Sequence, residues 1–194
     1  MNTTDMLQTI TPIIEQYAIH IAAFTFTIIT VLYLSRNKIK RDWFNFKIHR
    51  QLSNLGIKQL SNVHWPDGLD HYFTIDRLIM RHDGISLLMY MPYPGKIFCA
   101  DNIEEWTQMI GQKSYTFKNP FNELNYQINT LSESIPDIPV NGYVFFDQLS
   151  EFPKGHPDRV IHYKEIPKEL RPNKQIEVEN NIEDAWETLL KIKN

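Results

Sequence analysis

The segment from residue 76 to residue 96 constrains the fold of this 194-residue chain more than any other part. Its centre, Gly84–Met91, is an almost uninterrupted apolar run between an Asp83-Gly84 turn and Pro92. A short apolar run bounded by turn signals is typical of a strand buried on both faces. Proline cannot continue the ladder of a central strand. We therefore predict a central strand over 84–91, preceded by a strand over Tyr72–Met80.

The best helix signal of the remaining chain begins at Asn119-Pro120. Asn119 is a favourable N-cap and proline is well tolerated at the first helical position. Apolar residues then recur at helical spacing until Ile135, and Pro136 ends the pattern. The sequence therefore predicts an amphipathic helix that covers one face of a sheet.

Other elements follow from the same kinds of pattern. We predict helices over Trp43–Leu60 and Ile182–Ile192, strands over Gly95–Ala100, Val140–Phe146 and Arg159–Tyr163, a turn of helix over Glu104–Gln108, and a polar loop over Asn62–His71. This order of helices and strands predicts the α/β class, with a mixed central sheet flanked by helices.

Composition excludes several classes of site. The net charge of −3 gives no global electrostatic argument for a nucleic-acid partner. A single cysteine, Cys99, excludes an internal disulfide and a zinc ribbon, and we interpret it as a small buried residue. No nucleotide-binding or hydrolase motif is present. His64 and His71 flank Asp67 and Asp70, a group that we interpret as a solvated polar loop.

The stretch Tyr17–Leu34 contains no Asp, Glu, Lys or Arg. Eighteen helical residues at about 1.5 Å each extend for roughly 27 Å, just enough to cross the hydrocarbon core of a bilayer. We therefore predict a transmembrane helix over residues 17–35. The alternative is an ordinary buried helix, which is disfavoured because the stretch is apolar all round and a basic cluster abuts one end only.

The charges on either side of this stretch predict its orientation. Basic residues follow it from Arg36 to Arg50, whereas the sixteen residues before it contain two acids and no Lys or Arg. The positive-inside bias therefore predicts a single-pass protein of the bacterial inner (plasma) membrane, with its N-terminus outside and its C-terminal domain in the cytoplasm. The basic cluster has two explanations, membrane topology and attraction to anionic lipid.

The soluble part resembles the nuclease-related domain (NERD) family, restriction-endonuclease-like α/β modules that often follow a transmembrane helix. The marks are Ile75-Asp76, Asp83-Gly84-Ile85, Pro94-Gly95-Lys96, Trp106, Asn119-Pro120, and the Val140–Phe146 strand with Phe152 and Pro157 beyond it. The resemblance divides the chain into five segments. They are a short extracytoplasmic N-terminus (1–16), a transmembrane helix (17–35), a basic linker (36–42), a NERD-like domain (43–170), and a C-terminal linker and helix (171–194).

The resemblance also implies a catalytic arrangement, of which this chain keeps little. The strand aspartate falls on Asp76, which is implied as a vestigial metal ligand. The Glu-x-Lys pair falls on Met89 and Met91, and a glutamine expected after Asn-Pro falls on Glu123. The acid expected in the first helix is missing, because 44–60 contains no Asp or Glu.

These losses bear on catalysis, because metal-assisted phosphodiester hydrolysis needs a hard cation held by carboxylate oxygens. Methionine sulfur is a soft ligand and a poor partner for magnesium. Removing one electrostatic stabiliser often costs about 10²–10³ in rate. We therefore expect a pseudoenzyme without a cofactor. Packing is the alternative role of Met89 and Met91, and a capping or salt-bridged acid is the alternative role of Asp76, with Arg77 or Arg81 as partner.

Three functions remain open. The first is a membrane-anchored, cytoplasm-facing NERD-like domain that binds nucleic acid or a protein partner without cleaving. The second is an active Mg²⁺-dependent nuclease with relocated ligands. The third is a membrane assembly factor whose helix meets a partner helix through His20, Ala22 and Ala23.

Overall fold

The computed structural model describes residues 3–68, 71–172 and 177–192, without the side chains of residues 3–16, 19 and 37. The chain divides into two compact units, residues 1–50 and residues 51–194. The predicted extracytoplasmic segment, residues 1–16, lies with its side chains outside the described part. Asp70 and part of the predicted C-terminal linker also lie outside it.

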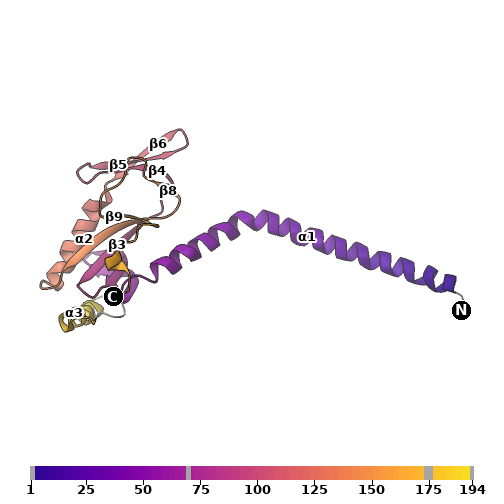
Figure 1. Cartoon of the computed structure of the whole chain (residues 1–194), viewed down its shortest axis with the longest axis horizontal. Coiled ribbons are helices and arrows are strands. Elements are labelled where there is room, and N and C mark those ends of the chain that lie inside the picture. The colour runs from indigo at the N-terminus through magenta and orange to yellow at the C-terminus, as the bar shows by residue number, and fades with distance from the viewer. Residues whose placement is uncertain (1–2, 69–70, 173–176, 193–194) are drawn as a thin grey trace. The chain divides into compact units, whose positions relative to one another are not determined.

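One long helix, α1 (Thr3–Leu52), makes up almost all of the first unit (Figure 1). No glycine interrupts this stretch, and the chain turns only at Gly56, which has a φ of +64°. The hydroxyls of Thr25, Thr27 and Thr30 donate to carbonyls of the preceding turn, so these polar groups are satisfied within the helix. The structure thus confirms helix over the predicted span.

The prediction that this helix crosses a membrane has a different outcome from the prediction that it is helical. Among the described residues, no helix has both the length and the apolar character needed to cross a membrane. The transmembrane part of the prediction for residues 17–35 is therefore not supported by the structure.

The second unit is built on a mixed five-stranded sheet. The strands are β1 (Lys58–Pro66), β2 (Tyr72–Met80), β3 (Ile85–Met91), β7 (Val140–Phe146) and β9 (Val160–His162), in that spatial order. β1, β2 and β3 form an antiparallel meander, whereas β3, β7 and β9 pair in parallel. The mixed α/β class is confirmed, and the predicted bounds of β2 and β7 match the observed ones.

A smaller sheet joins the first at the end of β3. It contains β6 (Lys113–Lys118), β5 (Glu105–Ile110), β4 (Gly95–Phe98) and β8 (Ser150–Glu151), in that order. The Trp106 side chain of β5 is fully buried and contacts Phe121 edge to face at 5.3 Å between ring centroids. This contact connects the small sheet to the start of the helix that covers the large one.

Three helical segments complete the unit. They are α2 (Pro120–Ser134), a 3₁₀ turn η1 (Lys168–Leu170) and α3 (Asn180–Ile192). α2 runs along the large sheet (Figure 1), and its cap is the predicted one, since Asn119 Oδ1 accepts a hydrogen bond from the Phe121 N–H at 2.9 Å. The close approach of α2 to β7 depends on Gly142, because a Cβ there would lie 2.5 Å from Ile128 Cδ1.

Two local predictions are wrong. Asn62–His71 is not simply a polar loop, because β1 occupies 58–66 as an edge strand with only two buried side chains, Val63 and Trp65. Glu104–Gln108 is not helical, because β5 and β6 form a hairpin across a two-residue turn that begins at Gly111. The helix predicted over 43–60 ends at Leu52.

Candidate functional site

A pocket of about 180 Å³ opens where β2, β3 and α2 meet. All four residues that the sequence singled out line it: Asp76 from β2, Met89 and Met91 from β3, and Glu123 from α2. The pocket thus brings together residues as far apart along the chain as Asp76 and Glu123. Thr74, Tyr90 and Gln127 complete the wall, and none of these three was predicted.

Asp76 occupies the position at which β2 loses its regular pairing. Arg77 and Leu88 form the last residue pair between β2 and β3. Between β1 and β2, the residues on either side of Asp76 are paired but Asp76 itself is not. The residue opposite Asp76, Asn62, has a φ of +52°, which asparagine tolerates better than most residues. Asp76 therefore lies in a short irregular part of the strand.

The carboxylate of Asp76 replaces the missing backbone partner. Its Oδ2 accepts a hydrogen bond from the Tyr90 N–H at 2.7 Å, just beyond the last ladder pair. Hydrogen bonds from a backbone N–H to a charged carboxylate are among the stronger ones in proteins. The capping role that the sequence offered as an alternative for Asp76 is therefore observed. Of the two arginines offered as ion-pair partners, Arg81 pairs with Asp83 at 3.1 Å. The charge of Asp76 acts on Arg77, where it partly offsets the lowering of the guanidinium pKa by burial.

Tyr90 also connects the pocket to the end of β7. Its hydroxyl donates to Asp147 Oδ2 at 2.8 Å, and Asp147 Oδ1 accepts from the Leu149 N–H at 2.8 Å. Burial, reinforced by the hydrogen bond to Asp147, raises the pKa of Tyr90 above its ordinary value. The phenol is therefore a neutral donor at physiological pH, and it fixes the strand that bears Met89 and Met91.

Glu123 is held by the buried amide of Gln127. Gln127 Nε2 donates to Glu123 Oε1 at 3.3 Å and to the Thr74 carbonyl at 3.4 Å. The two residues are four apart on α2 and so share one helix face, a spacing that could have revealed Gln127 from the sequence. The amide places the carboxylate at the same wall as Asp76.

A second pocket, of about 330 Å³, shares the side chains of Met89, Met91 and Glu123 with the first. Its other side includes Tyr93 and Phe117, whose rings contact edge to face at 4.6 Å between centroids. Met89, Met91 and Glu123 therefore lie between the part of the surface that holds Asp76 and the part that holds the two aromatic rings.

The side chains that line the pocket can be compared with the ligands that a hard cation such as Mg²⁺ prefers. Magnesium prefers six oxygen ligands in near-ideal octahedral geometry, whereas two of the lining side chains here carry thioether sulfur. One of the two Asp76 oxygens already accepts a backbone hydrogen bond. These residues therefore do not fit a magnesium ion. The described residues also contain no group of three or more His, Cys, Asp or Glu side chains suited to a metal.

The remaining polar groups do not line this pocket, although His64 contacts Thr74, which does. His64 lies on β1 and contacts Thr74 of β2 through its ring nitrogen at 3.3 Å, so it is not part of a loop. Asp67 accepts from the His71 N–H in the connection between the two strands. Burial, with a smaller contribution from Asp101, raises the pKa of Cys99 to about 12, so the thiol is protonated and unreactive.

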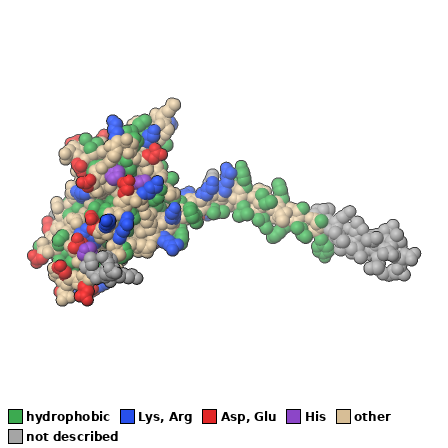
Figure 2. Space-filling model, in the orientation of Figure 1, with side chains coloured by type: hydrophobic (Ala, Val, Ile, Leu, Met, Phe, Trp, Pro, Cys, Tyr) green, Lys and Arg blue, Asp and Glu red, His purple; other side chains and the backbone are tan. Residues whose placement is uncertain are grey.

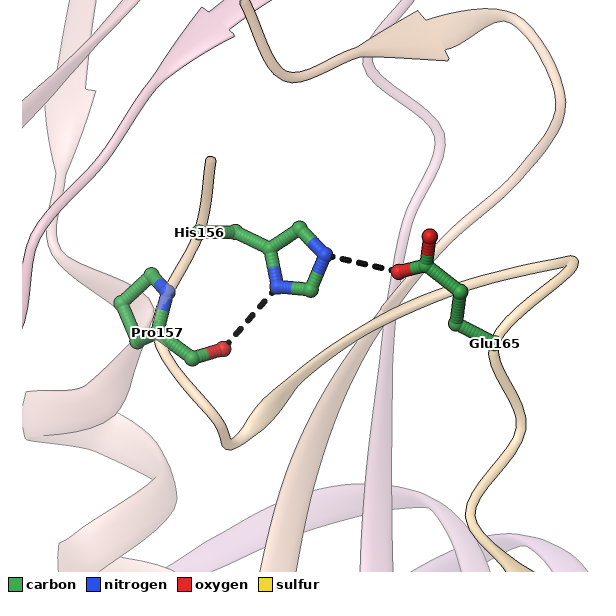
Figure 3. A network of polar contacts seen from close by, with 3 residues as sticks. All are labelled: His156, Pro157 and Glu165. Carbon is green, nitrogen blue, oxygen red and sulfur yellow. Dashed lines mark hydrogen bonds and ion pairs between the residues drawn. The ribbon is translucent and has the colours of Figure 1, made fainter. Parts of the chain in front are cut away.

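A separate polar contact involves His156. One ring nitrogen of His156 lies 2.9 Å from Glu165 Oε2 and the other lies 3.0 Å from the Pro157 carbonyl (Figure 3). The Phe152 ring packs against His156 and against His162. This group orders the segment after β8, and its residues do not line either pocket described above.

The fold and the pocket together define a class of protein: an α/β domain with a polar pocket between two adjacent strands of a mixed sheet and the helix that covers them. Comparison with protein families agrees with this class. The chain matches the nuclease-related domain, NERD, over residues 39–147, more than half of its length, and it belongs to that family. No curated protein and no solved structure matches the chain.

Proposed function

We propose that this NERD domain has lost nuclease catalysis and acts as a binding module with a restriction-endonuclease-like frame. The observation that carries the proposal is the occupation of the pocket wall by Met89 and Met91, at the positions where the family resemblance implies Glu and Lys. Thioethers supply neither the hard oxygen ligand nor the positive charge that phosphodiester hydrolysis requires. The retained Asp76 contributes to strand geometry through Tyr90.

The family membership supports nucleic acid as the bound molecule. A protein partner is favoured by the charge of the two pockets, which are lined by Asp76 and Glu123 and by one cationic residue, Lys118. Carboxylates repel a phosphate backbone, whereas nucleic-acid sites are rich in Lys and Arg. We therefore infer that the pocket itself receives a neutral or basic group, and that any contact with phosphates lies elsewhere.

Metal binding by the full chain tests the loss of catalysis. Calorimetric titration with Mg²⁺ or Mn²⁺ should give no heat of binding in the low-millimolar range, and the chain should leave DNA and RNA uncleaved. The matched control is Asp76→Asn, which removes the charge but keeps an oxygen that can accept the Tyr90 N–H. Metal binding or cleavage that disappears in Asp76→Asn, at an unchanged melting temperature, would favour the second function, a nuclease with relocated ligands.

We also propose that α1 attaches the protein to the inner membrane, with the NERD domain on the cytoplasmic side. The support is the exposure of large apolar side chains from Tyr17 to Leu34, a stretch without charged residues (Figure 2). Alkaline extraction of membranes should leave the full chain in the pellet. The control is a variant with Ile28, Ile29 and Leu32 each changed to Asn, which should move to the supernatant. Release of the unaltered chain would contradict membrane attachment.

The third function, an assembly factor, places a partner helix against His20, Ala22 and Ala23. Cross-linking in membranes distinguishes it from simple attachment, because an assembly factor should give a discrete higher-mass species that is lost on changing Ala22 and Ala23 to Leu. Finding only monomers would count against this function.

A further inference from the structure

The last third of α1 carries two apolar stripes on opposite sides of the helix. Ile39, Trp43 and Phe46 follow the i, i+4, i+7 spacing of a single helix face, and their exposed fractions are 51%, 64% and 63%. Ile48 follows Ile39 by nine residues, or about two and a half turns of 3.6 residues, and is buried. The exposed stripe is therefore separate from the side of the helix that is covered.

Cations border this exposed stripe on both sides. Within residues 36–47, five basic residues have exposed side chains and there is one acid, Asp42: the five are Arg36, Lys38, Lys40, Arg41 and Lys47. At about 100° per residue, Arg36, Lys40 and Lys47 fall on one side of the stripe and Lys38 on the other, whereas Arg41 falls on the opposite side of the helix. The ammonium group of Lys47 lies over the Trp43 ring at 5.7 Å from its centroid. Among the described side chains of residues 36–47, Arg41 and Asp42 form an ion pair that is long at 4.0 Å and exposed, so it does little to neutralise the surface.

We propose that this surface, the basic aromatic stripe formed by Ile39, Trp43 and Phe46 with their flanking cations, binds the headgroup region of anionic lipid. An amphipathic helix with Trp and Phe on one face and Lys and Arg around it lies in the plane of the bilayer interface. The apolar side chains enter the acyl boundary, and the long basic side chains extend to the phosphates. Each basic residue near an anionic surface adds attraction that salt screens.

Lipid fits this surface better than nucleic acid does. Both offer phosphates to the cations, but only a bilayer covers the apolar stripe, and three exposed large apolar side chains at helical spacing gain little from a phosphate backbone. The stripe follows the exposed apolar residues that end at Leu34, after the four polar residues 35–38. The proposal does not require residues 17–34 to cross the bilayer. It can therefore be tested separately from membrane attachment through those residues.

The structure provides a specific probe for this contact. Of the four tryptophans, Trp43 is the exposed one, while Trp65, Trp106 and Trp186 are buried. Acrylamide quenching of tryptophan fluorescence in the full chain therefore reports mainly on Trp43. The measurement is made with the chain reconstituted in vesicles of phosphatidylcholine alone and in vesicles that also contain phosphatidylglycerol, each at low and high salt.

The expected result is a loss of Trp43 quenching and a blue shift of its emission in the phosphatidylglycerol vesicles at low salt, reversed at high salt. Replacing the four flanking cations, Arg36, Lys38, Lys40 and Lys47, by Gln should abolish this protection. The matched control replaces four exposed lysines of the other unit, Lys113, Lys154, Lys164 and Lys168, by Gln and should retain it. This control changes the net charge equally and leaves the stripe intact.

The outcomes separate the two membrane proposals. Protection of Trp43 by phosphatidylglycerol without stable association with phosphatidylcholine supports the stripe and counts against insertion of residues 17–34. Stable association with both lipids but equal quenching in both overturns the stripe and leaves insertion standing. Association with neither lipid overturns both. Protection of Trp43 by added DNA or RNA, and not by phosphatidylglycerol, also overturns the assignment to lipid.

Discussion

Two apolar stretches of this chain differ in what covers them. Residues 85–88 of β3 have almost no exposed surface, because β2 and β7 pair with the strand on either side and side chains pack on both faces. Residues 20–34 of α1 are exposed along nearly their whole length. Hydrophobicity alone therefore does not determine burial. The strand is covered by its own domain, whereas the helix has its apolar surface available to a bilayer or to another protein.

The largest expected effect compares leucines from the two stretches. Leu87→Ala removes a fully buried side chain from β3 and should lower the free energy of unfolding by about 2–5 kcal/mol. Leu32→Ala removes a half-exposed side chain from α1 and should change it by less than about 0.5 kcal/mol. Urea unfolding of both variants measures the difference. Equal losses would contradict the contrast in burial.

The second prediction concerns the close packing of the covered region. A Cβ at position 142 would lie 2.5 Å from Ile128 Cδ1 and 2.9 Å from Leu124 Cγ. Gly142→Ala should therefore destabilise the domain by about 1–3 kcal/mol through overpacking. Ala22→Val adds volume on the exposed helix and should leave the unfolding midpoint almost unchanged. Ile128→Val removes the Cδ1 atom that the new Cβ would meet. If Ile128→Val costs as much stability in the Gly142→Ala background as in the natural chain, the proposed clash is not the cause.

The third prediction examines the pocket, where the sheet is least regular. Asp76→Ala removes the acceptor of the Tyr90 N–H and should cost about 1–3 kcal/mol, because a partly buried donor is left without a partner. Asp76→Asn retains an acceptor oxygen and should recover most of this loss. Thermal unfolding of both variants measures it. Equal losses in the two variants would show that the charge, and not the hydrogen bond, matters most.

The smallest expected effect is a pH dependence from His162. Burial is the main cause that lowers the pKa of His162 from its ordinary value, and the nearby Glu165 partly offsets it. The unfolded chain therefore takes up this proton more readily than the folded chain does. The stability that depends on neutral His162 is complete above about pH 6.5 and is lost as pH falls towards the lowered pKa.

Melting temperatures of the natural chain and of His162→Gln, recorded from about pH 7.5 to about pH 5, measure this dependence. The natural chain should lose more of its melting temperature on acidification than the variant does. The comparison of the two cancels the pH dependence of all other groups, which both proteins share. Parallel curves would mean that His162 does not contribute.

The sequence was sufficient for the elements with strong patterns. β2 and β7 match their predicted bounds, and α2 begins at the predicted cap, because continuous apolar runs and an Asn-Pro pair act locally. β1 was missed because an edge strand with only Val63 and Trp65 buried has the composition of a loop. The β5–β6 hairpin was missed although Gly111-Gln112 offers a two-residue turn, a signal typical of hairpins.

The pocket was predictable only in part. Asp76, Met89, Met91 and Glu123 were singled out through the family resemblance, and the structure places all four on one wall. Tyr90 and Asp147 were not, because their contact joins residues 57 positions apart and depends on the pairing of β3 with β7. The capping role of Asp76 likewise depends on where the ladder between β2 and β3 stops.

The mixed pairing of the large sheet has a consequence for how the chain folds. β1, β2 and β3 are neighbours in sequence and close short loops, whereas Ile85 must find Val140 across 55 residues. Loop closure costs more entropy for longer loops, and non-local parallel pairing slows folding. The antiparallel meander should therefore form early, before α2 packs on it and before β7 pairs with β3. During that interval one edge of β3 is unpaired, and this nascent domain is most vulnerable to aggregation on or near the ribosome.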